Sequence, residues 1–236
     1  MKIHGLNKLT LLDYPGLMAC TVFTGNCNLR CPFCQNAPLV LFPEREPVIP
    51  EDELAGFLKK RSGILEGVCV TGGEPTLSPA LPEFLSGLKS LGYAVKLDTN
   101  GTNPELLKSL TADGLVDYIA MDIKSSPARY AQAVGIPGFD TAPIMESADF
   151  LMHCGLPFEF RTTVVRELHD EVVFRDIASW LSGARAYYLQ AFEDSGALVG
   201  SVLSPGQSLS GYTKEELLGF VQLLAPHFKT AALRGV

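Results

Sequence analysis

Short apolar runs alternate with amphipathic segments along most of this chain. The runs are rich in Val, Ile and Tyr, and they predict strands at residues 18–24, 67–71, 93–97, 116–123, 158–165 and 186–191. Between them, apolar residues recur at the spacing i, i+3, i+4 and i+7, which is typical of helices that pack one face against a sheet. This alternation predicts repeated βα units and a parallel sheet. Since eight such units would need ~250 residues, six strands in this chain predict an α/β fold, a partial (βα)₆ barrel.

Capping residues mark the expected starts of several helices. Ser78 and Asn103 each stand at an expected first turn with Pro as the next residue, which suits the first helical position. Thr213 and Glu216 have the spacing of a capping box before the last amphipathic segment. The pattern therefore predicts helices that begin at these three positions.

We predict a single domain over residues 1–236, because a chain of this length can bury one substantial core. Within it we expect an N-terminal extension at 1–16, a βα core at 17–191, and a loop with a C-terminal helix at 192–236. Residues 192–210 are rich in Gly and Ser and predict a long loop that could border a site.

Composition and charge narrow the range of functions. Charged residues make up 19% of the chain and hydrophobic residues 47%, as in globular proteins, and the net charge of −7 argues against a nucleic-acid groove. No apolar run approaches the ~20 residues of a membrane helix, and residues 1–10 lack the apolar segment of a signal peptide. We therefore expect a cytoplasmic protein with reduced thiols and no membrane partner.

Three cysteines lie within one short segment after the first predicted strand. Cys27, Cys31 and Cys34 have the spacing C-x₃-C-x₂-C. Thiolates are soft ligands that suit an iron–sulfur cluster or zinc, and parallel α/β folds place their chemistry where strands end. Three ligands would leave one metal position open for a small molecule, whereas a fourth Cys or His elsewhere would make a structural zinc site.

A glycine-rich turn follows the second predicted strand. Gly72, Gly73, Glu74 and Pro75 stand between that strand and a helix. Two glycines without side chains would let the backbone approach a ligand closely. In isolation the same four residues would more often form a plain turn.

Polar residues also stand at the ends of the later predicted strands, where side chains could face a common cavity. They are Asp98, Thr99, Asn100, Asp122, Lys124, Arg161 and Gln190. Each has a simpler interpretation: an Asx turn for the segment 98–101, a solvated strand end for Lys124, and an outward ion pair for Arg161.

The cysteine motif and the glycine turn together resemble those of the radical S-adenosylmethionine (SAM) enzymes. Phe33 supplies the aromatic residue before the last cysteine in that family's signature, and residues 72–75 match its GGEP motif. The resemblance implies a [4Fe–4S] cluster on Cys27, Cys31 and Cys34. It also implies that SAM binds the open iron, with its amino group held by the GGEP turn.

Residues 98–101 resemble the DTNG segment of glycyl-radical-enzyme activases, which lies beside SAM. The same likeness makes Asp98, Thr99 and Asp122 candidate ligands of a monovalent cation. It favours Arg161 as the partner of the SAM carboxylate.

Residues 8–16 resemble the activating proteins of anaerobic ribonucleoside-triphosphate reductases. The implied reaction is reductive cleavage of SAM to a 5′-deoxyadenosyl radical, which then generates a glycyl radical on a partner enzyme. Reduced flavodoxin or ferredoxin is the implied electron donor, and Asp13 is implied as a contact with the partner. Gln35 departs from the family, which often has His at this position.

Two alternatives stay open on the sequence. One is a radical SAM enzyme that acts on a small molecule, and the other is a non-catalytic module with structural zinc. Cys20, Cys69 and Cys154 are expected to be buried apolar residues rather than ligands, and the four histidines show no metal-ligand spacing.

Overall fold

Eight strands form one sheet in the described part of the chain, and their order in the sheet is their order in the sequence. The structure is a computed structural model, and it describes residues 1–194, 196–206 and 208–235. The strands are β1 (Ile3–Thr10), β2 (Ala19–Thr24), β3 (Gly67–Gly72), β4 (Ala94–Thr99), β5 (Tyr118–Asp122), β6 (Phe158–Val164), β7 (Ala186–Ala191) and β8 (Thr230–Arg234). The α/β fold class with a mostly parallel sheet is confirmed.

Helices follow most of the strands. They are α1 (Ala37–Leu41), α2 (Glu51–Arg61), α3 (Leu81–Ser90), α4 (Pro104–Ala112), α5 (Tyr130–Ala133), α6 (Ala142–His153), α7 (Glu171–Trp180), α8 (Val199–Leu203) and α9 (Lys214–Leu224), with short 3₁₀ helices η1 (Pro43–Arg45), η2 (Pro75–Leu77) and η3 (Pro127–Arg129). Among the described residues no helix is both long and apolar enough to span a membrane.

The contacts divide the chain into two units, which we describe separately. Unit 1 contains Met1–Asn28, Pro38–Thr99 and Asn103–Ala120, and unit 2 contains Leu29–Ala37, Asn100–Thr102 and Met121–Val236. β5 contributes residues to both.

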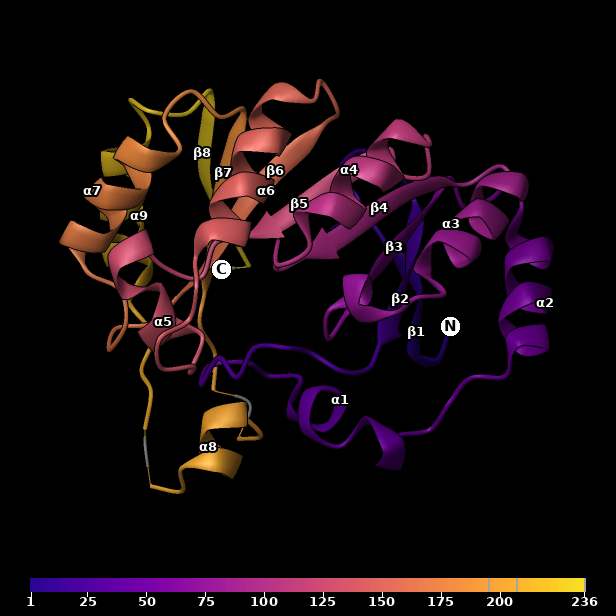
Figure 1. Cartoon of the computed structure of the whole chain (residues 1–236), viewed down its shortest axis with the longest axis horizontal. Coiled ribbons are helices and arrows are strands. Elements are labelled where there is room, and N and C mark those ends of the chain that lie inside the picture. Colours follow the sequence, from indigo (N-terminus) through magenta and orange to yellow (C-terminus); the bar gives the residue numbers. More distant parts are fainter. Residues whose placement is uncertain (195, 207, 236) are drawn as a thin grey trace. The chain divides into compact units, whose positions relative to one another are not determined.

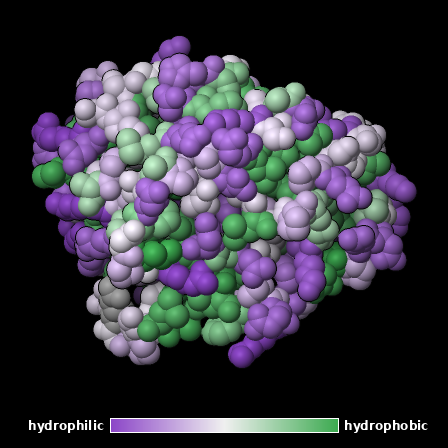
Figure 2. Space-filling model, in the orientation of Figure 1, coloured by the Kyte–Doolittle hydropathy of each residue, from purple (hydrophilic) through white to green (hydrophobic). Residues whose placement is uncertain are grey.

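Unit 1 is built on β1 to β4. β1 runs antiparallel to β2, whereas β2, β3 and β4 are parallel, with Cys69 of β3 opposite Lys96 of β4. Cys20 and Cys69 are fully buried, so their assignment to the core is confirmed. α2 and α3 lie side by side in this unit (Figure 1). Hydrophilic side chains gather over α2 on the face shown in Figure 2, where its acidic first turn and basic last turn are exposed.

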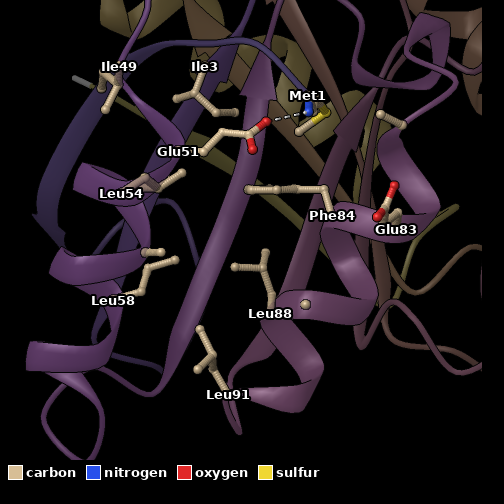
Figure 3. A pocket seen from close by; sticks show the side chains of 13 residues that line it. Met1, Ile3, Ile49, Glu51, Leu54, Leu58, Glu83, Phe84, Leu88 and Leu91 are labelled. Atoms are coloured by element: carbon tan, nitrogen blue, oxygen red, sulfur yellow. Dashed lines mark ion pairs between the residues drawn. The ribbon is translucent and has the colours of Figure 1, made fainter.

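A pocket of about 340 Å³ lies between α2 and α3. Leu54 and Leu58 of α2 and Leu88 of α3 line it, and the amino group of Met1 lies 3.6 Å from a carboxylate oxygen of Glu51 at its rim (Figure 3). None of the residues predicted for a functional site lines this pocket.

Unit 2 is built on the parallel strands β6, β7 and β8. α7 and α9 pack together in this unit, with the rings of Phe174 and Phe220 4.7 Å apart (Figure 1). Tyr187 of β7 lies opposite Phe160 of β6 and packs its ring against Phe228.

The structure has two strands that the apolar pattern did not predict. β1 lies in the segment expected to be an N-terminal extension, and β8 follows the last helix. β1 is an edge strand in which Asn7 and Lys8 are exposed, so it lacks a continuous apolar run. The predicted loop at 192–210 contains α8, and residues 195 and 207 of that loop, like residue 236, lie outside the described residues.

One of the predicted helix starts is wrong and two are confirmed. Ser78 ends η2 instead of beginning a helix, and α3 starts after Ala80, because Pro75 begins a separate 3₁₀ turn. The side chain of Asn103 caps α4 as expected. Thr213 and Glu216 form the expected capping box of α9.

Replacing Thr213 by Ala should lower the free energy of unfolding by about 1 kcal/mol. The Thr213 hydroxyl accepts the backbone N–H of Glu216 at 3.3 Å, and the Glu216 carboxylate accepts the backbone N–H of Thr213 at 2.8 Å. Urea unfolding measures the change, with the exposed Gln222→Ala of the same helix as control. Equal stability of the two variants would contradict a stabilising role for the cap.

Candidate functional site

The glycine turn after β3 is hydrogen bonded to the segment that leads to Cys27. The backbone N–H of Gly73 donates to the carbonyl of Thr24 at 2.9 Å, and that of Glu74 donates to the carbonyl of Asn26 at 2.7 Å. Asn26 itself has a left-handed backbone with φ of 63°, which brings the chain sharply round before the first cysteine of the motif. Unit 1 therefore fixes the predicted ligand next to the predicted turn.

Both glycines are required by the close approach of backbone to backbone. A Cβ on Gly73 would lie 1.9 Å from the carbonyl oxygen of Asn26, and a Cβ on Gly72 would lie 2.4 Å from backbone atoms of Thr24. Gly72 also has a positive φ of 116°. In this structure the absent side chains make room for the residues before Cys27.

Glu74 joins the turn to the end of β4. Its carboxylate is almost fully buried, and it accepts hydrogen bonds from the backbone N–H of Thr76 at 3.1 Å and the hydroxyl of Thr99 at 2.8 Å. Pro75 begins η2 directly after it. The predicted residues Glu74 and Thr99 are therefore brought together within unit 1.

Asp98 is paired with a residue that the sequence analysis missed. Nζ of Lys96 forms an ion pair with the Asp98 carboxylate and lies 3.8 Å from Sγ of Cys69. Lys96 is only 1% exposed. The sequence did contain a signal, because a Lys two residues before an Asp in a strand points to the same side of it.

The other two cysteines of the motif belong to unit 2. The backbone N–H of Cys34 donates to the carbonyl of Cys31 at 3.0 Å and closes a tight turn. The N–H of Val199 donates to Cys34 at 2.9 Å, and the N–H of Gly200 donates to Pro32 at 2.9 Å. The start of α8 thus holds the cysteine turn through the backbone.

Phe33 packs beside a buried histidine. Its ring lies edge-on to that of His169, with the centroids 6.3 Å apart. The N–H of Val165 donates to Nδ1 of His169 at 2.9 Å, which assigns the ring proton to Nε2, and Nε2 donates to the carbonyl of Lys124 at 2.9 Å. Burial lowers the pKa of His169, so a neutral ring positions Phe33 and Lys124.

Asp122 accepts hydrogen bonds from two cations. Its Oδ1 lies 2.9 Å from Nη2 and 2.9 Å from Nε of Arg161, and its Oδ2 lies 3.0 Å from Nζ of Lys124. Burial alone would raise the pKa of Asp122, but Arg161 and Lys124 hold it at about 2. Burial disfavours the charged ammonium, whereas Asp122 and the thiols of Cys31 and Cys34 raise the pKa of Lys124. The predicted guanidinium thus has a protein carboxylate as partner.

The Asp122 pairings should make stability depend on pH in the acid range. A carboxyl group with a lowered pKa stabilises the folded state above about pH 4, and this contribution is lost as pH falls towards 2. The unfolding free energies of the wild type and Asp122→Asn should therefore converge by roughly 2 kcal/mol over that range. The exposed Asp149→Asn is the control in urea unfolding at each pH. A difference for Asp122→Asn that stays constant with pH would contradict the expectation.

Asn100 and Gln190 occupy different settings in unit 2. The side-chain oxygen of Asn100 accepts the N–H of Thr102 at 3.0 Å, which is the Asx turn considered above as the simpler interpretation. Gln190 lies near the end of β7, opposite Thr163 of β6. Gln35 donates from its amide nitrogen to the carbonyl of Glu193 at 2.6 Å, so this position serves as a backbone tether.

Asp13 lies near the amino end of β2, because Thr10 pairs with Ala19 at the start of that strand. Its carboxylate accepts a hydrogen bond from the hydroxyl of Thr21. Leu11 and Leu12, beside it, are 70% and 85% exposed. Cys27 follows the opposite end of β2.

The structure holds no disulfide among the described cysteines. Cys27 belongs to unit 1, whereas Cys31 and Cys34 belong to unit 2. In the described part of the chain, no three His, Cys, Asp or Glu side chains form a group that could hold a metal ion.

Comparison with known proteins extends this geometry. Residues 21–177 match the family model described as the radical SAM superfamily. A Methanocaldococcus jannaschii protein with the provisional name of glycyl-radical enzyme activating enzyme is 31% identical over 201 residues, which cover 83% of this chain and 81% of the relative. A Neisseria meningitidis 7-carboxy-7-deazaguanine synthase is 32% identical over 139 residues, which cover 59% of each chain.

A solved structure shares the fold. A domain of the pyruvate-formate lyase-activating enzyme from Bacteroides vulgatus superposes with a TM-score of 0.56 and 18% identity, over 70% of this chain and 98% of that domain. At this identity the likeness concerns the fold alone, and it matches the observed α/β sheet.

Proposed function

The chain belongs to the radical SAM superfamily, and from this premise we propose that it generates a glycyl radical on a partner enzyme, an anaerobic ribonucleotide reductase. The observation that carries the proposal is the M. jannaschii relative, whose similarity covers more than four fifths of both chains. The family implies a [4Fe–4S] cluster and SAM as cofactors.

The residues present fit these cofactors. Three thiols supply the soft ligands of a [4Fe–4S] cluster, with Cys27 and Cys31 only four positions apart in the chain. Lys124 carries a positive charge in the electrostatic range of the Cys31 and Cys34 thiols, which suits a site for anionic thiolates. When bound, the cluster and SAM supply a carbon-centred radical that removes a hydrogen atom.

We assign the remaining roles to residues at strand ends. The backbone of the turn at Gly72, Gly73, Glu74 and Pro75 would hold the amino group of SAM. Arg161 would orient the cofactor while it stays paired with Asp122. Phe33, Asp98, Asn100, Lys124 and Gln190 complete the proposed cofactor site.

The first test is metal analysis after anaerobic reconstitution. We expect about four irons and four sulfides per chain, with a spectral change when SAM is added. A single zinc per chain would contradict the proposal and favour the non-catalytic zinc module.

The second test identifies the substrate. The protein is reduced with dithionite in the presence of SAM and a co-expressed anaerobic ribonucleotide reductase, and paramagnetic resonance should show a glycyl radical. The similarity to a deazaguanine synthase favours a small-molecule substrate as the second candidate function. Cleavage of SAM without a glycyl signal on the reductase would support that candidate.

A further inference from the structure

Lys96 is a charged side chain at the centre of a buried strand in unit 1. Its neighbours in β4, Val95 and Leu97, have no exposed surface, and Lys96 itself is 1% exposed. Burying an ammonium group is unfavourable unless it is paired. The ion pair with the Asp98 carboxylate supplies this partner, and Sγ of Cys69 lies 3.8 Å away.

The geometry of the strand fixes the direction of the pair. Residues i and i+2 project from the same side of a strand, so the Lys96 stem runs along β4 towards its carboxyl end. The side chain of Asp98 is 12% exposed and that of Lys96 is 1% exposed. The ammonium group therefore lies on the buried side of the carboxylate. The ring of Tyr118, with its centroid 6.0 Å from Nζ, adds a favourable contact for a cation.

The second acid that was expected to bind a monovalent cation is neutralised in the same way. Asp122, in unit 2, has Lys124 two residues later and pairs with it at 3.0 Å, besides its bonds to Arg161. Each unit thus provides a lysine two positions from its acid. The charge that a bound K⁺ or Na⁺ would supply is already present in both.

We propose that the Lys96 ammonium takes the place of a monovalent metal cation at Asp98, so that this enzyme binds and cleaves SAM without K⁺ or Na⁺. Lys96 is then a positioning residue that acts through Asp98. A second cation at this carboxylate would stand close to the ammonium group and be repelled by it. The inference rests on the proposed function, because it requires SAM to bind beside Asp98.

The test compares SAM binding and SAM cleavage in three salts of equal ionic strength: potassium, sodium and tetramethylammonium chloride. The wild type should give the same dissociation constant for SAM in all three, within twofold. For Lys96→Met in tetramethylammonium, we expect binding at least tenfold weaker. Potassium or sodium should restore at least fivefold, because a metal ion can occupy the vacated position. The exposed-side pair Lys89 and Asp117 offers the control, since Lys89→Met should show no salt effect on SAM binding.

Two results would overturn the inference. One is a wild type whose SAM binding weakens fivefold or more when potassium and sodium are absent, and this series decides the matter even if Lys96→Met does not fold. The other is a Lys96→Met protein that binds SAM as tightly as the wild type in every salt. SAM binding without a glycyl radical on the reductase would reject the proposed partner and leave the inference standing. A wild type that does not bind SAM would reject both.

Discussion

Replacing Gly73 by Ala is expected to destabilise the protein by more than about 3 kcal/mol and to remove SAM binding. The new Cβ would lie 1.9 Å from the carbonyl oxygen of Asn26 and 2.7 Å from its carbonyl carbon, far inside contact distance. Both atoms are backbone, so relief requires movement of the segment that carries Cys27. Urea unfolding and the iron content after reconstitution measure the two effects.

Gly87→Ala is the matched control. A Cβ at Gly87, in the middle of α3, meets no atom within 4 Å. Because Ala is the better helix former, this variant should be as stable as the wild type or more stable by up to about 1 kcal/mol. A Gly73→Ala protein with normal stability and normal iron content would show that the turn is not held against Asn26 as described.

Replacing Cys31 by Ala is expected to abolish the cluster. Iron should fall from about four per chain to nearly none, and SAM cleavage should fall by more than about a thousandfold, since the reaction depends on the cluster. Iron analysis and the yield of methionine after reduction with dithionite measure these losses.

Cys20→Ala separates loss of a ligand from loss of packing. Cys20 is fully buried in β2, so its truncation should lower the free energy of unfolding by about 1 to 2 kcal/mol and leave the iron content unchanged. Retention of four irons by Cys31→Ala would contradict the ligand assignment. Loss of iron from Cys20→Ala would do so as well, because it would show that packing alone controls the metal content.

The sequence allowed much of the sheet to be predicted because its parallel strands are buried on both faces. β7 was predicted with its observed bounds, and β2 within one residue. Continuous apolar runs are the expected pattern of such strands. β1 escaped because an edge strand with exposed Asn7 and Lys8 has no such run. β8 is short, and its burial depends on neighbours that are distant in the sequence.

The candidate site was predictable in its residue types but not in their pairings. The cysteine motif and the turn at Gly72 and Gly73 are local patterns that can be read directly. Alternation in a strand indicates the side on which Lys96 lies, but it does not indicate that the charge is buried. The contact of His169 with the carbonyl of Lys124 joins residues 45 positions apart, and no local pattern could reveal it.

The placement of Asp13 has a consequence for the size of molecule that can sense it. Asp13 and Cys27 flank opposite ends of β2, a strand of six residues that spans roughly 17 Å. A short glycine-containing peptide at the cysteine end would be too small to reach Asp13, whereas an intact partner protein could cover both. Substitution of Asp13 should therefore impair turnover of the whole partner and spare a truncated fragment, which separates docking from hydrogen abstraction along a single strand.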